Sequence, residues 1–403
     1  MKKAIKESLS PEYALFRWLW LIILFPKAVQ LVLLYVLLVF LLSRSGLRCL
    51  RNPVSVAMLI LAGLHLMAIV HNMLFLHSGD DRLPAALSTM LLWPLAAGFY
   101  AYYSVRPADM NRIGKACCFN LLLLFLEAVA AVLLYHLTGQ DEIRLLGRYL
   151  YGWVEYEKDV RLFRFFGFHD YSNMCVLYAM LMYTLATYSL RKTTLLRRGL
   201  VTVAFLFPVL CARSRSGLVL AAFSLLMCVF DLIPKRAKKG TAILVLGACL
   251  AGVILFYGKI SQFVLDRIIL GNASSNGLRM EIYENSLREA WTLSPVLGMG
   301  IKRWYIPGYP LGSHSTYLGF FYKTGLLGVP VGLFAVLRPN WDVFRNIRKN
   351  SYLLSVSFFL LSFVIMLALE DVDGTNWFPA AYFAMLALFA RLPGGERGEE
   401  GRI

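Results

Sequence analysis

Long apolar runs, each bounded by charged or turn-forming residues, recur along this chain of 403 residues. About 20 apolar residues suffice to cross a lipid bilayer as a helix, and the pattern predicts about twelve such spans. The candidate spans cover residues 13–25, 28–43, 54–74, 85–104, 114–137, 171–189, 199–212, 216–233, 240–257, 314–337, 351–369 and 376–390. The first two flank Pro26 and Lys27, so they form either two short helices or one kinked helix, which would give eleven spans.

The composition agrees with this pattern. Hydrophobic residues make up 59% of the chain and charged residues only 16%, whereas soluble proteins carry about a quarter charged residues. This excludes a cytosolic enzyme, a disordered chain and a small disulfide scaffold. The seven cysteines lie mostly in or beside apolar runs without metal-ligand spacing, which indicates buried hydrophobic side chains. We therefore expect an all-α polytopic membrane protein, with residues 1–403 in a single membrane domain.

The distribution of charge predicts the orientation in the membrane. The net charge is +17, and with a cytoplasmic N-terminus nearly all of the excess Lys and Arg falls in cytoplasmic segments, as the positive-inside rule requires. The basic character is thus a topology signal and does not indicate nucleic-acid binding. This topology places both termini in the cytoplasm and leaves two large external loops, 138–170 and 258–313. We expect the chemistry on the extracytoplasmic side.

Two arginines lie in a short external turn between the seventh and eighth candidate spans. Arg213 and Arg215 precede Ser216 and Gly217, which open a helix. Guanidinium groups beside the free N–H groups of a helix N-terminus suit a phosphate or diphosphate. The alternative is that both arginines reach lipid headgroups at the membrane surface.

The second external loop contains a segment with helical spacing of apolar residues, which predicts an amphipathic helix near 277–291. Arg279 falls in its first turn, where a cation opposes the helix dipole. Either a bound anion or a salt bridge to Asp266 or Glu281 would offset this.

A histidine stands at the start of the tenth candidate span. His314 lies between Ser313 and Ser315, after a stretch rich in Gly and Pro. A helix dipole opposes protonation at its N-terminus, so we expect a neutral imidazole that can accept a proton near pH 7. The alternative is an ordinary residue of the membrane interface.

Two further polar groups lie at the predicted outer ends of spans. Arg164, His169 and Asn173 precede or begin the sixth candidate span. A second group near residue 370 is acidic and could hold a divalent cation, orient a sugar or form a solvated turn. It consists of Glu370, Asp371 and Asp373.

Four motifs in order resemble the bacterial O-antigen ligases and the O-antigen, capsular and exopolysaccharide polymerases. They are RFFGFHDYSN, RSRSGLVLA, LRMEIY followed by PVLGMG, and SHSTYLGFFYKTGLLG, over roughly residues 155–335. The resemblance implies an all-helical, glycosyltransferase-C-like enzyme without a metal or cofactor. Such an enzyme transfers a glycan from an undecaprenyl-diphosphate carrier to an acceptor hydroxyl, with inversion, on the outer side of the inner membrane.

The resemblance also implies roles for individual residues. Arg213 or Arg215, together with Arg279, would bind the donor diphosphate, and His314 would orient or deprotonate the acceptor hydroxyl. Contacts with the glycan or acceptor would come from Arg164, Asn173 and Ser315. Many relatives have Asn where this chain has Ser315, so the chain departs from the family pattern at that acceptor contact.

The sequence leaves the acceptor open. A polymerase would extend a lipid-linked glycan, and a ligase would use lipid A core; the wider occurrence of polymerases favours polymerase slightly. Membrane lipids and a chain-length regulator are further expected partners. Two other classes compete: a transporter of lipid-linked polysaccharide, and a cell-wall glycan polymerase that would use an external acid such as Asp266 or Asp373. Mid-membrane polar residues are too few to favour a transporter.

Overall fold

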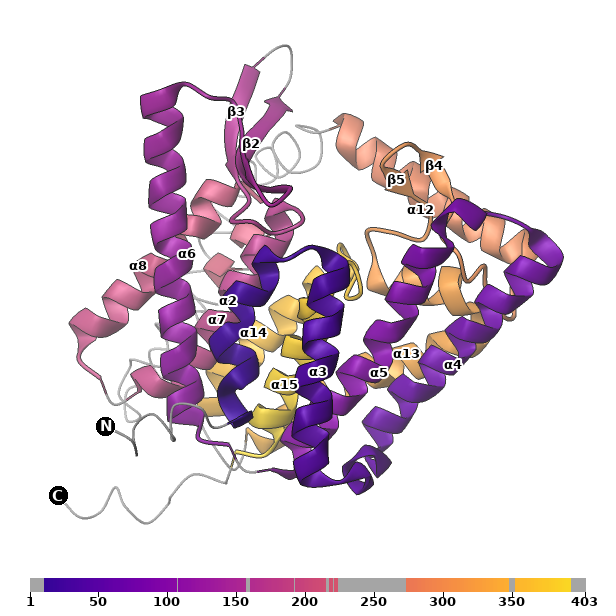
Figure 1. Cartoon of the computed structure of the whole chain (residues 1–403), viewed down its shortest axis with the longest axis horizontal. Helices are drawn as coiled ribbons and strands as arrows, with labels where there is room; N and C mark the ends of the chain where they lie inside the picture. The colour runs from indigo at the N-terminus through magenta and orange to yellow at the C-terminus, as the bar shows by residue number, and fades with distance from the viewer. Residues whose placement is uncertain are drawn as a thin grey trace, which may run out of the picture.

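The computed structural model describes residues 11–106, 108–156, 160–191, 193–214, 217–219, 221–223, 273–347 and 352–392. These residues form a mostly helical bundle (Figure 1). Its α-helices are α2 (Ala14–Leu24), α3 (Lys27–Ser45), α4 (Pro53–His71), α5 (Leu83–Val105), α6 (Met110–Thr138), α7 (Ser172–Leu190), α8 (Leu195–Ala212), α12 (Ala273–Leu293), α13 (Thr316–Asn346), α14 (Tyr352–Met366) and α15 (Trp377–Ala390).

Seven helical segments of the described chain are long and apolar enough to cross a membrane. They are Lys27–Ser45, Pro53–Leu76, Leu83–Val105, Met110–Thr138, Ser172–Leu190, Leu195–Ala212 and Thr316–Asn346. Three shorter apolar helices, α2, α14 and α15, accompany them. The candidate span 240–257 and most of 216–233 lie outside the described residues. This architecture is that of a polytopic helical membrane protein.

The first two candidate spans are separate helices, α2 and α3. The chain is extended at Phe25 and Pro26, and α3 begins at Lys27. The buried Gln30 amide donates to the carbonyl oxygens of Ile23 and Phe25, each at 3.0 Å. These bonds satisfy acceptors at the end of α2, which stabilises the break between the helices.

Strands occur where the sequence predicted only helices and loops, so the all-α prediction needs an amendment. Strands β1 (Ile143–Leu145), β2 (Arg148–Tyr156) and β3 (Val160–Phe165) form an antiparallel sheet in order β1-β2-β3. Strands β4 (Trp304–Ile306) and β5 (Tyr309–Pro310) form a short hairpin. Figure 1 shows both groups and α12 at one end of the bundle, which we call the strand end.

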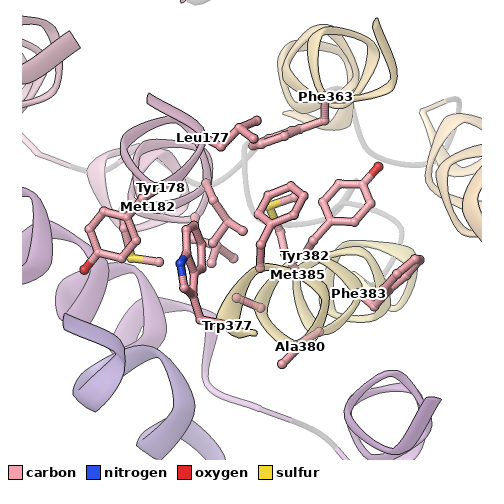
Figure 2. Packing of buried hydrophobic residues seen from close by; sticks show 14 of the residues in the cluster. Leu177, Tyr178, Met182, Phe363, Trp377, Ala380, Tyr382, Phe383 and Met385 are labelled. Atoms are coloured by element: carbon pink, nitrogen blue, oxygen red, sulfur yellow. The ribbon is translucent and has the colours of Figure 1, made fainter. Parts of the chain in front are cut away.

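The core is densest around α7 and α15, whose side chains are largely buried on all sides. Trp377 of α15 meets Tyr178 of α7 edge-on with ring centroids 5.5 Å apart, and Tyr382 packs on Phe363 of α14 at 5.5 Å (Figure 2). Helices buried on every face need no amphipathic pattern. This core fixes the short segment between α14 and α15, which contributes to the site.

A break in α13 receives the loop that follows α12. Gly325 has non-helical angles (φ 59°), and the N–H of Met299 donates to the carbonyl of Tyr322 at 2.7 Å. Gly298 and Gly300 also have positive φ, and a Cβ at Gly298 would lie 2.5 Å from the Gly325 nitrogen. Only glycine permits this backbone-on-backbone packing. The PVLGMG motif therefore ties the α12 segment to α13.

Candidate functional site

The site lies at the strand end, where segments far apart in sequence converge. Arg164 comes from β3, Asn173 from the first turn of α7, and Arg279 from α12. His314 lies two residues before α13, and Glu370 lies between α14 and α15. The structure thus brings together the residues predicted from separate motifs.

Arg279 contacts the segment after α14. Its Nη1 donates to the carbonyl oxygen of Leu369 at 3.2 Å, and its Nη2 lies 3.4 Å from Oε1 of Glu370. The proposed partner Asp266 lies outside the described residues, and the carboxylate bound here is Glu370 instead of Glu281. Helix α12 begins at Ala273, before the predicted start near 277, so Arg279 lies in its second turn and the predicted conflict with the helix dipole was wrong.

Glu370 is buried, with only 1% of its surface exposed. Its carboxylate accepts hydrogen bonds from the Asn173 amide and from Arg279. Burial raises the pKa of Glu370 to about 7, with a smaller effect in the same direction from Asp371, while Arg279 and Asn173 oppose the shift. The Thr316 hydroxyl donates to the Glu370 carbonyl at 2.7 Å. This carboxyl therefore changes charge near neutral pH.

The other two acids of this segment are also buried. Asp371 accepts from the Lys302 ammonium at 2.7 Å, and Asp373 pairs with the Lys323 ammonium. The interpretation of a solvated turn was therefore wrong. Each of the three carboxylates is bound to a cation or an amide, a donor set typical of ion pairs, and the described residues contain no cluster suited to a metal ion.

His314 has a left-handed backbone conformation (φ 64°). Its carbonyl oxygen accepts from the Tyr283 hydroxyl of α12 at 2.6 Å. The pKa of His314 is lowered to about 4, mainly by burial and then by the positive charges of Arg279 and Lys302, while Asp371 opposes the shift. The imidazole is therefore neutral at pH 7, as expected. The cause is burial and nearby cations, and not the helix dipole, because α13 begins only at Thr316.

Two of the predicted contact residues have structural partners. The Asn173 amide donates to Glu370. The Ser315 hydroxyl caps α13 by accepting the N–H of Leu318 at 3.4 Å. His169, by contrast, is buried against the rings of Tyr178 and Trp377.

Arg164 lies near the two other predicted site arginines that the structure describes, Arg213 and Arg279. Nη2 of Arg164 lies 3.5 Å from the Arg213 carbonyl, at the outer limit of a hydrogen bond. Burial lowers the pKa of Arg164, and the charges of Arg213 and Arg279 lower it further. Within the described chain neither Arg164 nor Arg213 has a carboxylate partner. Nε of Arg164 is buried and has no hydrogen-bond partner among the described residues. Arg215 lies outside the described residues. Mutually repelling guanidinium groups of this kind are suited to an anion.

The region that holds Arg213, Arg279 and His314 matches a known family. Residues 200–333 match the family model described as O-antigen ligase. This match supports the resemblance of the chain to the O-antigen ligase and polymerase family. A search of curated proteins gives no match. The family and the apolar helices together indicate a multi-pass inner-membrane protein that performs glycosyl transfer of the O-antigen ligase and polymerase type.

The O-antigen ligase match does not reach Glu370, and sequence analysis missed its role. Glu370 pairs with Arg279, which lies 91 positions earlier, and with Asn173, which lies 197 positions earlier. No local pattern encodes such pairs. One signal was present in the sequence. Glu370 ends an apolar run on the same predicted side of the membrane as Arg279, an arginine for which the sequence offered no certain partner.

Proposed function

We propose that this chain transfers an oligosaccharide or polysaccharide from an undecaprenyl-diphosphate carrier to an acceptor hydroxyl at the outer face of the inner membrane, as a polysaccharide polymerase. The observation that carries the proposal is the cluster of Arg164, Arg213 and Arg279 beside a neutral His314. The cluster supplies positive charge for a diphosphate leaving group, and the imidazole can accept a proton.

In this mechanism Arg213, Arg215 and Arg279 bind the donor diphosphate. His314 accepts the proton of the acceptor hydroxyl, whose oxygen attacks the anomeric carbon as the bond to the diphosphate breaks. The guanidinium groups stabilise the negative charge that develops on the leaving lipid diphosphate, so the reaction requires no metal. Attack opposite the leaving group inverts the anomeric carbon.

Donor binding would also prepare the base. Arg279 lowers the pKa of His314 in the free protein. A diphosphate bound to Arg279 would neutralise that charge and raise the pKa of His314 towards neutrality, where a general base is most effective. For Asn173 and Ser315, the contacts with Glu370 and Leu318 support a positioning role more than direct contact with the acceptor.

The test uses purified protein in lipid vesicles with undecaprenyl-diphosphate-linked repeat units and no other acceptor. A ladder of glycan products would support the polymerase. We expect His314→Ala to reduce transfer by about 10²–10⁴-fold. Arg279→Ala should reduce kcat/KM by roughly 10- to 100-fold, because it removes hydrogen bonds to a charged group. Arg338→Ala is the control, since Arg338 lies in the C-terminal half of α13 and pairs with Asp342.

The family match favours a second candidate, a ligase that transfers the glycan to lipid A core. A wild type that forms no ladder but transfers glycan to added lipid A core would support the ligase and exclude the polymerase. A folded wild type that does neither, with the cognate repeat, would overturn both.

A further inference from the structure

A cavity at the strand end lies between α12 and the β4–β5 hairpin. Its volume is about 390 Å³, within the range of small-molecule sites. The lining side chains used below are Asn285, Arg288, Thr292, Arg303, Trp304 and Tyr305. None of them belongs to the diphosphate and histidine site, and none was singled out by the sequence motifs.

The walls of the cavity combine aromatic rings with planar hydrogen-bond donors. Trp304 is 46% exposed, with the Arg82 guanidinium 3.9 Å from its ring centroid and its indole N–H bound to Asp81 at 3.0 Å. The Tyr305 hydroxyl donates to Glu281 at 2.8 Å. These contacts hold both rings in place before any ligand arrives, which reduces the entropic cost of binding.

The charged neighbours show that Trp304 faces a polar space. An exposed Trp in a membrane protein can be an ordinary interface residue. Here, however, the cavity is also lined by Arg288 and Arg303, which pair with Glu284 at 2.9 Å and Glu289 at 3.4 Å. Lipid tails would leave those charges unsolvated. A ligand with both polar and C–H surface fits the lining better.

A saccharide has this surface. Its ring presents a face of C–H groups that can stack on an aromatic ring, and a rim of hydroxyl groups that bind guanidinium and amide groups. We propose that the cavity between α12 and the β4–β5 hairpin binds a saccharide unit of the glycan substrate, away from its reacting end. This proposal rests on the proposed glycosyl transfer.

The position along α12 sets which saccharide unit would bind. At a rise of 1.5 Å per residue, Arg288 and Thr292 lie roughly 14 and 20 Å along the helix axis from Arg279. This is the length of a few linked sugars. The cavity therefore accepts a unit a few residues from the diphosphate, which only an oligosaccharide can reach.

The test measures binding of the cognate repeat oligosaccharide, released from its lipid by mild acid, to the full-length protein in nanodiscs. Thr292→Trp fills the cavity from an exposed position whose hydroxyl donates to the Arg288 carbonyl within α12. We expect it to raise Kd at least about tenfold, and Trp304→Ala to do the same. Leu287→Trp is the matched control, because Leu287 is exposed on α12 but does not line the cavity; its Kd should stay within about twofold of wild type.

His314→Ala separates the two proposals. It should reduce transfer by about 10²–10⁴-fold but retain oligosaccharide binding. If neither the wild type nor any variant transfers glycan, but Thr292→Trp and Trp304→Ala still weaken oligosaccharide binding, the glycosyltransferase proposal fails and the saccharide site in the cavity is supported. If transfer occurs but Thr292→Trp binds the oligosaccharide as wild type does, or wild type does not bind it, the cavity proposal is overturned.

Discussion

Replacing Glu370 with glutamine tests both the burial of this carboxyl and its pairing with Arg279. Glutamine has nearly the same shape and keeps an oxygen that can accept from Asn173 and Arg279, but it carries no charge. Glu370→Gln therefore resembles the wild type with its carboxyl permanently protonated. The two proteins should differ only where Glu370 is ionised.

The pKa values give the size and direction of the effect. In the unfolded chain the pKa of Glu370 is close to its ordinary value of 4.5, and in the folded protein burial raises it to about 7. Below pH 4.5 the carboxyl is protonated in both states. As pH rises towards 7 the unfolded chain loses its proton first, so folding becomes less favourable by up to about 3 kcal/mol. At pH 8 the loss is complete.

The assay is thermal unfolding of both proteins in nanodiscs at pH 5 and pH 8. We expect a small Tm difference at pH 5, where about a quarter of the effect is present, and a Tm several degrees higher for Glu370→Gln at pH 8. An equal difference between the two proteins at both pH values would refute the argument that burial raises the pKa of Glu370. A natural chain that keeps a destabilising carboxylate beside Arg279 suggests selection for function over stability.

Two further predictions concern the neighbouring charges. In the Glu370→Gln background, kcat/KM should stay constant from about pH 8 to 5.5 and fall at lower pH with an apparent pKa of about 4. The reason is that burial and Arg279 keep His314 unprotonated in the free protein. A fall centred on pH 6.5 would contradict this prediction. Lys323→Met leaves the buried Asp373 without its closest cation and should destabilise by about 3–5 kcal/mol. Lys323→Met with Asp373→Leu should recover most of that loss in thermal unfolding, and failure to recover would show that the charge pair itself is required.

The sequence predicted the features that depend on local pattern. Apolar runs located helices α2 to α8 and α13 to α15. Short motifs predicted that Arg279 and His314 share one site, and the structure places both residues at the strand end. The strands were missed, although alternating aromatic residues at Tyr149, Tyr151 and Trp153 carry the period-two signal of a strand. These residues fall in the predicted external loop 138–170, so the pattern was interpreted as loop.

Long-range pairs could not be predicted in the same way. Asp371, Asp373 and Gly374 resemble an exposed turn in composition, yet both carboxylates are buried because Lys302 and Lys323 come from other segments to meet them. Burial of a charge depends on its partner. The partner is defined by the packing of α13 against the α14–α15 segment, which no single stretch of sequence specifies.

The backbone at His314 shows how these pairs serve the site. A histidine with φ of 64° is strained and persists only when its surroundings hold it. Here the Tyr283 hydroxyl binds the His314 carbonyl, and the Ser286 hydroxyl accepts the Gly312 N–H at 2.7 Å. Both hydroxyls belong to α12, which also carries Arg279. The same helix therefore sets the positions of His314, the proposed base, and of Arg279, which is proposed to bind the diphosphate. Any shift of α12 would move both together, so their separation is preserved when the donor binds.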